Sequence, residues 1–513
     1  MLLAALVIAG CGGGDDGGDG TADPASVAPA QAPIFINFTL RPEGETKQNI
    51  DALAEKIAGI DNVGDLIIGE LENSASEDGE EFDYEKEVEP WLGKEGGLFL
   101  REYEDDDFES YGVAIQTSDE DAARAFIDKQ LESEDEAPEE GSYEGVDFKV
   151  EADDGTTIGV FDGLVAMAED EEAFKSMVDA SDGENLAGEE AYSDAVADVP
   201  ANSAADIYVD IGGLIEESGG EIDPDAKMLL DNVGIEPKEA TAVASVVPGR
   251  DYLEVDVVSD LAGQEAPSGD ASQLLGSLDS EAVGAVAFAG FGDQLQEAID
   301  ELDKEGIPGE IPPNQLKNGL KEAGIDLDAI TGSVEQAAIF LTGRNEGTLS
   351  GVLVLTTDGS DGPTEAIESV GKLLKSLGTA GVTIKGGGGA KGFEVRSPDL
   401  EGRELTVLTM GNRIAIGFGS DLVTSVPLAL LPGEGARLAD MAEFKEAEEA
   451  LGQTPISGFV HGPRALKLAE SFITPGDSEF EGIKPYLDNV SAVAIGSEPE
   501  GDRAKAKLIF LIE

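Results

Sequence analysis

The feature that most constrains the fold of this chain is a succession of short apolar segments and amphipathic stretches that occurs twice in the same order. The segment at 112–115 is similar to the one at 351–354, 148–150 to 393–395, and 165–167 to 414–416, at separations of about 240 to 250 residues. Stretches with helical periodicity follow at 119–131 and 364–377. The repeat predicts an internal duplication: two similar α+β halves at residues 33–261 and 281–513, joined by a polar linker at 262–280.

Turn signals separate neighbouring apolar segments in both halves. Asp162-Gly163 joins the segments 156–161 and 163–168, and Met410-Gly411-Asn412 joins 405–409 and 413–417. Short turns of this kind connect antiparallel strands. We therefore expect each half to be a largely antiparallel sheet with helices packed on one face.

The only cysteine of the chain, Cys11, directly follows the residues Ile8, Ala9 and Gly10. This pattern resembles the lipobox of bacterial lipoproteins, in which a small residue precedes the cysteine that is lipidated. Residues 1–11 are interpreted as a truncated signal peptide ending in a lipobox, since the apolar stretch is too short to span a membrane. The Gly-, Asp- and Pro-rich residues 12–32 predict a disordered tether. We expect an exported protein, anchored by its lipid to the outer face of the bacterial cell membrane.

Asp and Glu outnumber Lys and Arg by 108 to 32, which gives a formal net charge of −76. Nucleic acids are bound largely through Lys and Arg that displace counterions from phosphates, so this balance excludes a nucleic-acid partner. Hydrophobic residues still make up 41% of the chain, which is enough to form packed cores. The acidity therefore does not indicate a disordered chain.

The acidic excess is concentrated in the first half of the chain. Residues 1–270 contain 70 Asp and Glu against 13 Lys and Arg, whereas residues 271–513 contain 38 against 19. The densest clusters lie at 77–89, 102–109, 132–140 and 169–172. Two interpretations stay open: a solvated surface, or a surface that binds divalent cations or a basic protein partner. Asp105, Asp106 and Asp107 are the candidate cation ligands.

The turn Pro90-Trp91-Leu92-Gly93 precedes a strand-like segment at 97–100. Together with the lipobox and the preceding strand and helix, it resembles an uncharacterised family of exported bacterial proteins, domain of unknown function 3352. The resemblance covers most of the chain in layout and implies an architecture, but no activity and no catalytic residue. Trp91 is interpreted as a packing anchor; the alternative, a ring on which a ligand stacks, stays open.

His461 is the only histidine of the chain and the one candidate for an imidazole base. It follows a predicted strand at 456–460, and Asp210 holds the corresponding position in the first half, which favours a surface loop residue over a base in a Ser-His-Asp or Cys-His device. One His and one lipidated Cys cannot supply the usual ligands of zinc. We therefore assign no cofactor and no catalytic residue.

The sequence thus predicts an exported, lipid-anchored envelope protein that is a non-enzymatic binding or structural module. The first alternative is a hydrolase that uses two carboxylates as acid and base, although 108 candidates do not single out a pair. The second alternative is a calcium- or cation-binding surface protein. The sequence leaves the oligomeric state open.

Overall fold

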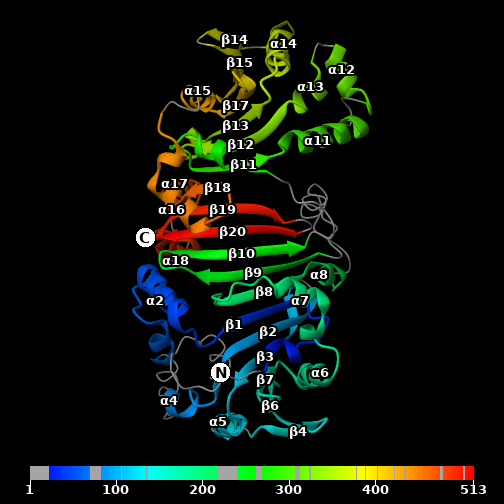
Figure 1. Cartoon of the computed structure of the whole chain (residues 1–513), viewed down its shortest axis with the longest axis vertical. Coiled ribbons are helices and arrows are strands. Elements are labelled where there is room, and N and C mark those ends of the chain that lie inside the picture. The colour runs from blue at the N-terminus through cyan, green and yellow to red at the C-terminus, as the bar shows by residue number, and fades with distance from the viewer. Residues whose placement is uncertain are drawn as a thin grey trace. The chain divides into compact units, whose positions relative to one another are not determined.

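The computed structural model describes residues 22–69, 82–104, 107–132, 137–217, 240–260, 269–306, 312–322, 325–376, 378–379, 381–387, 389–400, 402–420, 422–431, 435–473, 478–500 and 503–513. The chain divides into two compact units. Unit 1 contains Met1–Ala266 and Pro499–Ala506, and unit 2 contains Pro267–Glu498 and Lys507–Glu513. Figure 1 labels the elements of both units, which are described one at a time.

Unit 1 is built on an antiparallel sheet. Its strands are β1 (Ile34–Thr39), β2 (Leu92–Glu104), β3 (Asp107–Thr117), β4 (Glu139–Tyr143), β5 (Val146–Val150), β6 (Thr157–Phe161), β7 (Leu164–Ala168), β8 (Ala205–Asp210), β9 (Thr241–Pro248) and β10 (Tyr252–Asp260). Its helices include η1 (Pro24–Val27), α2 (Gly44–Ala58), α4 (Tyr84–Glu87), α5 (Glu120–Glu132), α6 (Glu171–Asp182), η2 (Leu186–Gly188), α7 (Glu190–Val196) and α8 (Ile211–Glu217). The strands lie in the order β4-β5-β6-β7-β3-β2-β1-β8-β9-β10, and every neighbouring pair is antiparallel.

The hairpin of β6 and β7 has the predicted two-residue turn. Phe161 pairs with Leu164, so Asp162 and Gly163 alone form the connection. Their φ angles are 51° and 77°, the left-handed values that a type I′ turn requires at both central positions. The antiparallel sheet expected from such turn signals is confirmed.

The sheet of unit 1 is covered by helices on both faces. Phe126 of α5 belongs to a core cluster with Ile158 of β6 on one face, and Phe174 of α6 packs against Phe148 and Phe161 on the other. All five residues of β6 are buried. The expectation that helices pack on one face is therefore wrong, because a continuous apolar strand of this kind needs cover on both sides.

Unit 2 and the carboxyl-terminal hairpin repeat this kind of architecture. The strands are β11 (Gly284–Ala289), β12 (Val334–Thr342), β13 (Ser350–Thr357), β14 (Val382–Gly387), β15 (Ala390–Val395), β16 (Glu404–Met410), β17 (Arg413–Gly419), β18 (Ile456–His461), β19 (Val490–Glu500) and β20 (Arg503–Ile512). The helices include α10 (Ser272–Gly276), α11 (Phe291–Glu305), α12 (Leu316–Glu322), α13 (Leu327–Thr331), η4 (Glu346–Thr348), α14 (Gly362–Ser376), η5 (Pro398–Leu400), α15 (Ser425–Leu430), η6 (Leu438–Asp440), α16 (Ala442–Leu451), α17 (Gly462–Glu470) and α18 (Ser478–Leu487). From β14 to β19 the order is β14-β15-β16-β17-β13-β12-β11-β18-β19, again antiparallel throughout.

The order of strand pairing is the same in the two units. β1 pairs with β2 and β8, as β11 pairs with β12 and β18, and β3 pairs with β7 as β13 pairs with β17. The likeness extends to two hydrogen bonds outside the sheets, in which Leu186 N donates to Ala28 O and Leu438 N donates to Leu278 O, both at 3.0 Å. Each unit is thus an α+β fold with the same connectivity.

Two of the predicted boundaries differ from the structure. Ala25, Val27 and Ala28, expected in the tether, lie in the core of unit 1 at 0% exposure. Leu274 and Leu275, expected in the linker, are buried residues of α10. In both places the apolar residues stand among Pro, Ser and Gly without a helical or strand-like period. The sequence therefore does not indicate that these segments are buried. Among the described residues, no helix is both long enough and apolar enough to cross a membrane.

Candidate functional site

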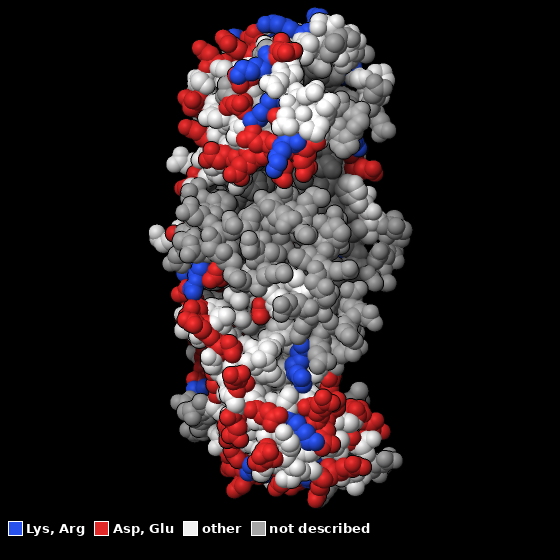
Figure 2. Space-filling model, turned by 90° about the vertical axis from the view of Figure 1, so that its right-hand side faces the viewer, with Lys and Arg blue, Asp and Glu red and all other residues white. Residues whose placement is uncertain are grey.

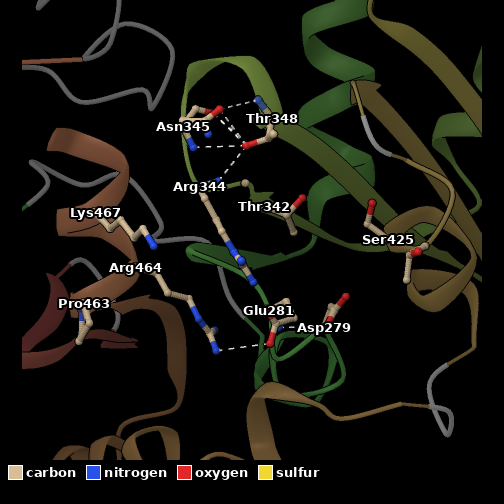
Figure 3. A pocket seen from close by; sticks show the side chains of 12 residues that line it. Asp279, Glu281, Thr342, Arg344, Asn345, Thr348, Ser425, Pro463, Arg464 and Lys467 are labelled. Carbon is tan, nitrogen blue, oxygen red and sulfur yellow. Dashed lines mark hydrogen bonds and ion pairs between the residues drawn. The ribbon is translucent and has the colours of Figure 1, made fainter. Parts of the chain in front are cut away.

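Unit 2 contains an open pocket of about 670 Å³, which Figure 3 shows from close by. Its volume lies in the range of small-ligand sites, roughly 300–1,000 Å³. The lining residues come from the turn before β11, the end of β12 and the loop after it, the start of α15, and α17: Asp279, Glu281, Thr342, Gly343, Arg344, Asn345, Thr348, Thr424, Ser425, Pro463, Arg464 and Lys467.

The loop between β12 and β13 presents Arg344 from a fixed backbone. The N–H groups of Arg344 and Asn345 donate to Thr348 Oγ1 at 3.0 and 3.3 Å, and the N–H of Thr348 donates to Asn345 Oδ1 at 3.2 Å. Gly343 begins the loop with a φ of 129°, and a Cβ at that position would lie 2.6 Å from the carbonyl oxygen of Thr348. Glycine is therefore required here, and the loop is held by its own hydrogen bonds.

Helix α17 contributes two cations from one of its faces. Arg464 donates from Nη1 to the carbonyl oxygens of Ser280 and, at 3.1 Å, of Ala282, and its Nη2 lies 3.8 Å from Glu281 Oε1. These contacts bind the helix to the turn before β11. Lys467 follows Arg464 by three residues, a spacing that places both side chains on the same side of a helix.

Arg344 and Lys467 make no ion pair with any described residue, although both side chains are exposed at the pocket. Most other described Lys and Arg residues lie near a carboxylate. In a chain with more than three acidic residues for every basic one, two unpaired cations in one pocket are an exception.

A smaller pocket of about 360 Å³ in unit 1 differs from this one in the pairing of its cations. Its cations are already paired: Arg124 Nη2 lies 2.8 Å from Glu120 Oε2, and Lys149 Nζ lies 2.6 Å from Asp128 Oδ1. The cationic groups of that pocket are therefore neutralised within the protein. The pocket of unit 2 is the stronger candidate for a ligand site.

His461 lies at the end of β18, in the position before the first residue of α17, and its side chain is 14% exposed rather than in a surface loop. Its side chain makes no capping hydrogen bond to that helix. Its Nε2 lies 4.0 Å from Glu443 Oε1, and its buried Nδ1 has no hydrogen-bond partner among the residues that the structure describes. Burial, and secondarily the charge of Arg464, lower the pKa of His461, so the imidazole is neutral at pH 7. The hydrogen bonds of the described residues do not join it to a hydroxyl nucleophile.

The predicted correspondence of His461 with Asp210 agrees with the strand pairing. Asp210 ends β8 and its N–H donates to the carbonyl oxygen of Pro33 at 2.8 Å; His461 ends β18 and its N–H donates to that of Val283 at 2.9 Å. Asp210 also accepts from the N–H of Gly213 at 2.9 Å, which caps α8. The two residues hold equivalent strand-to-helix junctions.

In the turn Pro90-Trp91-Leu92-Gly93, the last three residues are buried in unit 1, whereas Pro90 is exposed. Trp91 is 1% exposed, its ring centroid lies 5.5 Å from that of Phe126, and its Nε1 donates to the carbonyl oxygen of Glu87 at 2.7 Å. A Cβ on Gly93 would lie 2.4 Å from the Cβ of Gln116, so the turn packs closely against β3. The indole ring faces the core and offers no surface on which a ligand can stack.

The remaining predicted sites cannot be placed. Cys11 and the lipobox residues Ile8, Ala9 and Gly10 lie outside the described residues, as do Asp105 and Asp106. Asp107 begins β3, but its side chain is not described. In the described part of the chain, no group of three or more His, Cys, Asp or Glu side chains is arranged to hold a metal ion.

The pocket of unit 2 was not predicted from the sequence. None of Arg344, Arg464 and Lys467 was a candidate site residue. The spacing of Arg464 and Lys467 is a usable signal for one helix face. Arg344 lies about 120 residues earlier in the chain, and only the pairing of β11 with β12 and β18 brings it to the same place.

Comparisons with known proteins add a family but no activity. Crystal forms I and III of TP0453 each match 80% of this chain at 10% identity, cover 98% and 99% of their own chains, and have TM-scores of 0.18 and 0.19, values too low to support an argument. The comparison with curated proteins finds no match. A family model described as "Protein of unknown function (DUF3352)" matches residues 3–511. The resemblance predicted from the sequence is confirmed, and the chain belongs to this family.

Proposed function

We propose that this protein is an exported, lipid-anchored, non-enzymatic binding module, and that the pocket of unit 2 binds a small ligand through an anionic group. The observation that carries the proposal is the pair of cations Arg344 and Lys467, which face one pocket without a carboxylate partner among the described residues. In a chain of net charge −76, a cation that the protein leaves unpaired is available to an anion from solution.

The chemistry of the two side chains suits a carboxylate or a phosphate ester. A guanidinium presents two parallel N–H donors to a pair of oxygens, and an ammonium adds a compact positive charge. A charge-assisted hydrogen bond contributes about 1.5–3 kcal/mol, which is about tenfold or more in affinity. Acidic residues farther from the pocket weaken the attraction between these cations and an anion only partly. At physiological salt, ions in solution screen the repulsion from charges that lie more than about 8 Å away.

A matched pair of variants tests the pocket. Arg344→Gln with Lys467→Gln removes both free cations, whereas Lys304→Gln with Lys375→Gln removes two exposed cations of unit 2 that do not line the pocket. Titration calorimetry with butyrate and with inorganic phosphate is expected to show binding to the wild type and the control, and at least a tenfold loss in the pocket variant. Equal affinity in all three proteins, or no binding to any, would refute the proposal.

The lipid anchor rests on the order Ile8, Ala9, Gly10, Cys11 at the amino terminus. A diacylglyceryl group on Cys11 would hold the chain at a membrane surface. Cys11→Ala is expected to release the protein into the soluble fraction of cells that express the full chain, and Cys11→Ser, which also lacks the thiol, should behave in the same way. Membrane retention of both variants would contradict lipidation.

We attribute the common connectivity of the two units to an internal duplication. The support is the shared order of strand pairing and the equivalent junctions at Asp210 and His461. The two copies then differ in charge at matching places. The described acidic residues of the cluster 102–109 lie at the end of β2 and the start of β3, while the loop between the corresponding strands of unit 2, β12 and β13, carries Arg344.

A further inference from the structure

The pocket of unit 2 has an acidic side as well as a basic one. Asp279 is 8% exposed, and its Oδ1 accepts the N–H of Glu281 at 3.0 Å. Its second oxygen, Oδ2, has no donor among the residues that the structure describes. Figure 3 shows Asp279 on the opposite side of the pocket from Lys467, with Glu281 and Arg464 between them. A carboxylate oxygen in a pocket gains from a hydrogen-bond donor, and here a ligand can provide one.

The charge of the whole molecule favours a ligand without net charge over a purely anionic one that makes the same contacts. With a net charge of −76, the protein repels free anions at long range and attracts cations. A ligand with no net charge avoids this repulsion. It can still place an anionic group against Arg344 and Lys467 at short range, where the local charges dominate.

On the basis of the anion-binding function proposed above, we infer that the ligand is a net-neutral zwitterion with a primary ammonium group and one carboxylate or phosphodiester group. The anionic group contacts Arg344 and Lys467, and the ammonium donates to Asp279, whose Oδ2 is free. Thr424 and Ser425, at the start of α15, also line the pocket.

The residues that line the pocket also limit the chemical class of the ligand. None of the described residues that line it is aromatic, so a nucleobase or a sugar ring finds no surface for stacking. The recognition rests on the two charged ends of the ligand. Affinity should therefore depend on both ends together and on the length of the chain that joins them.

Compounds that carry only one of the two charged groups measure what each end of the ligand contributes to binding. Calorimetric titrations of the full chain would compare β-alanine, 4-aminobutyrate and 6-aminohexanoate with butyrate, which lacks the ammonium, and butylamine, which lacks the carboxylate. Aminoethyl methyl phosphate tests a phosphodiester in place of the carboxylate. At least one zwitterion is expected to bind about tenfold or more tightly than either butyrate or butylamine.

Three variants assign the ends of the ligand to the two sides of the pocket. Asp279→Asn keeps the acceptor for the N–H of Glu281; it is expected to reduce zwitterion binding to the level of butyrate without weakening the binding of butyrate. Arg344→Gln should weaken both ligands. Asp361→Asn, an exposed acid at the start of α14 outside the pocket, is the control and should change neither. Thermal melts of each variant check that the fold is retained.

The outcomes distinguish this inference from the function on which it rests. If butyrate binds through Arg344 but no zwitterion binds more tightly, the zwitterion inference is overturned and the anion site stands. If Asp279→Asn leaves zwitterion binding intact, the assignment of the ammonium to Asp279 is overturned. If neither butyrate nor any zwitterion binds, both proposals fail.

Discussion

Replacing Trp91 by alanine tests the packing of unit 1 at the largest fully buried side chain among its described residues. The indole is 1% exposed, packs against Phe126 at a centroid distance of 5.5 Å, and donates from Nε1 to the carbonyl oxygen of Glu87 at 2.7 Å. The backbone of the same residue accepts from Thr117 Oγ1 at 2.9 Å and from the N–H of Ser118 at 2.8 Å. The side chain thus joins the turn at 90–93, α4 and α5 in one cluster.

The expected loss of stability follows from these contacts. Truncating a fully buried Trp to Ala costs about 3–5 kcal/mol, a figure that includes the lost transfer free energy and the cavity left behind. The lost hydrogen bond to Glu87, about 1 kcal/mol, and the ring pair with Phe126, about 0.5–1.5 kcal/mol, place the change in the upper part of that range. For a unit of this size, such a loss lowers the melting temperature by about 10 °C.

The assay is thermal and urea unfolding followed by far-ultraviolet circular dichroism, because the variant lacks the only tryptophan of the chain. Trp91→Phe keeps most of the apolar volume and should lose about 1–2 kcal/mol. Leu66→Ala, at a side chain of unit 1 that is 50% exposed, is the control and should lose less than about 1 kcal/mol. If Trp91→Ala costs no more than Leu66→Ala, the interpretation of this turn as a packing anchor is wrong.

Three further predictions follow from individual groups. His461 is the only histidine, so the resonances of its ring protons can be followed through a pH titration by NMR without overlap from another histidine. Burial and the charge of Arg464 should hold its pKa below 6.5, and a pKa at or above 6.5 would contradict this. The free energy of unfolding should then be higher above pH 6.5 and fall as the imidazole is protonated at lower pH. Gly462→Ala places a Cβ 1.9 Å from the carbonyl oxygen of Val490 and should cost about 1–3 kcal/mol in urea unfolding, whereas Gly482→Ala, with open space at its Cβ, should cost nothing; equal effects would refute the close approach. Raising NaCl from about 0.02 to 0.5 M should raise the melting temperature, because salt screens the repulsion of a chain with a net charge of −76, and a fall would contradict this expectation. Figure 2 shows Asp and Glu side chains gathered over the described parts of one face, with few Lys and Arg among them.

Local signals in the sequence predicted most of the secondary structure and the antiparallel sheets. The Asp162-Gly163 turn adopts the predicted geometry, and the helices expected at 119–131 and 364–377 are α5 (Glu120–Glu132) and α14 (Gly362–Ser376). The prediction that helices cover one face of the sheet was wrong, because the run at 157–161 is continuous rather than alternating and both of its faces are buried. Small apolar residues such as Ala25 and Ala28 likewise give no signal that they fill a core.

The pocket was less predictable than the fold because it depends on long-range strand pairing. Asp279, Arg344 and Arg464 belong to three separate stretches of sequence, and no local motif links them. Known catalytic and metal-binding patterns depend mainly on residues such as His and Cys, of which the chain has one each. The chemistry of this pocket rests instead on unpaired cations in an acidic chain, and no sequence motif marks such a site.

The most direct test of the central claim is to locate a bound anion. Crystals of the full chain soaked in sodium bromide would show each ordered bromide ion by its anomalous scattering. The account predicts a bromide ion in the pocket of unit 2, between the guanidinium group of Arg344 and the ammonium group of Lys467, and its absence from crystals of the variant that lacks both cations. Bromide ions ordered elsewhere on unit 2, with none in this pocket, would contradict the account.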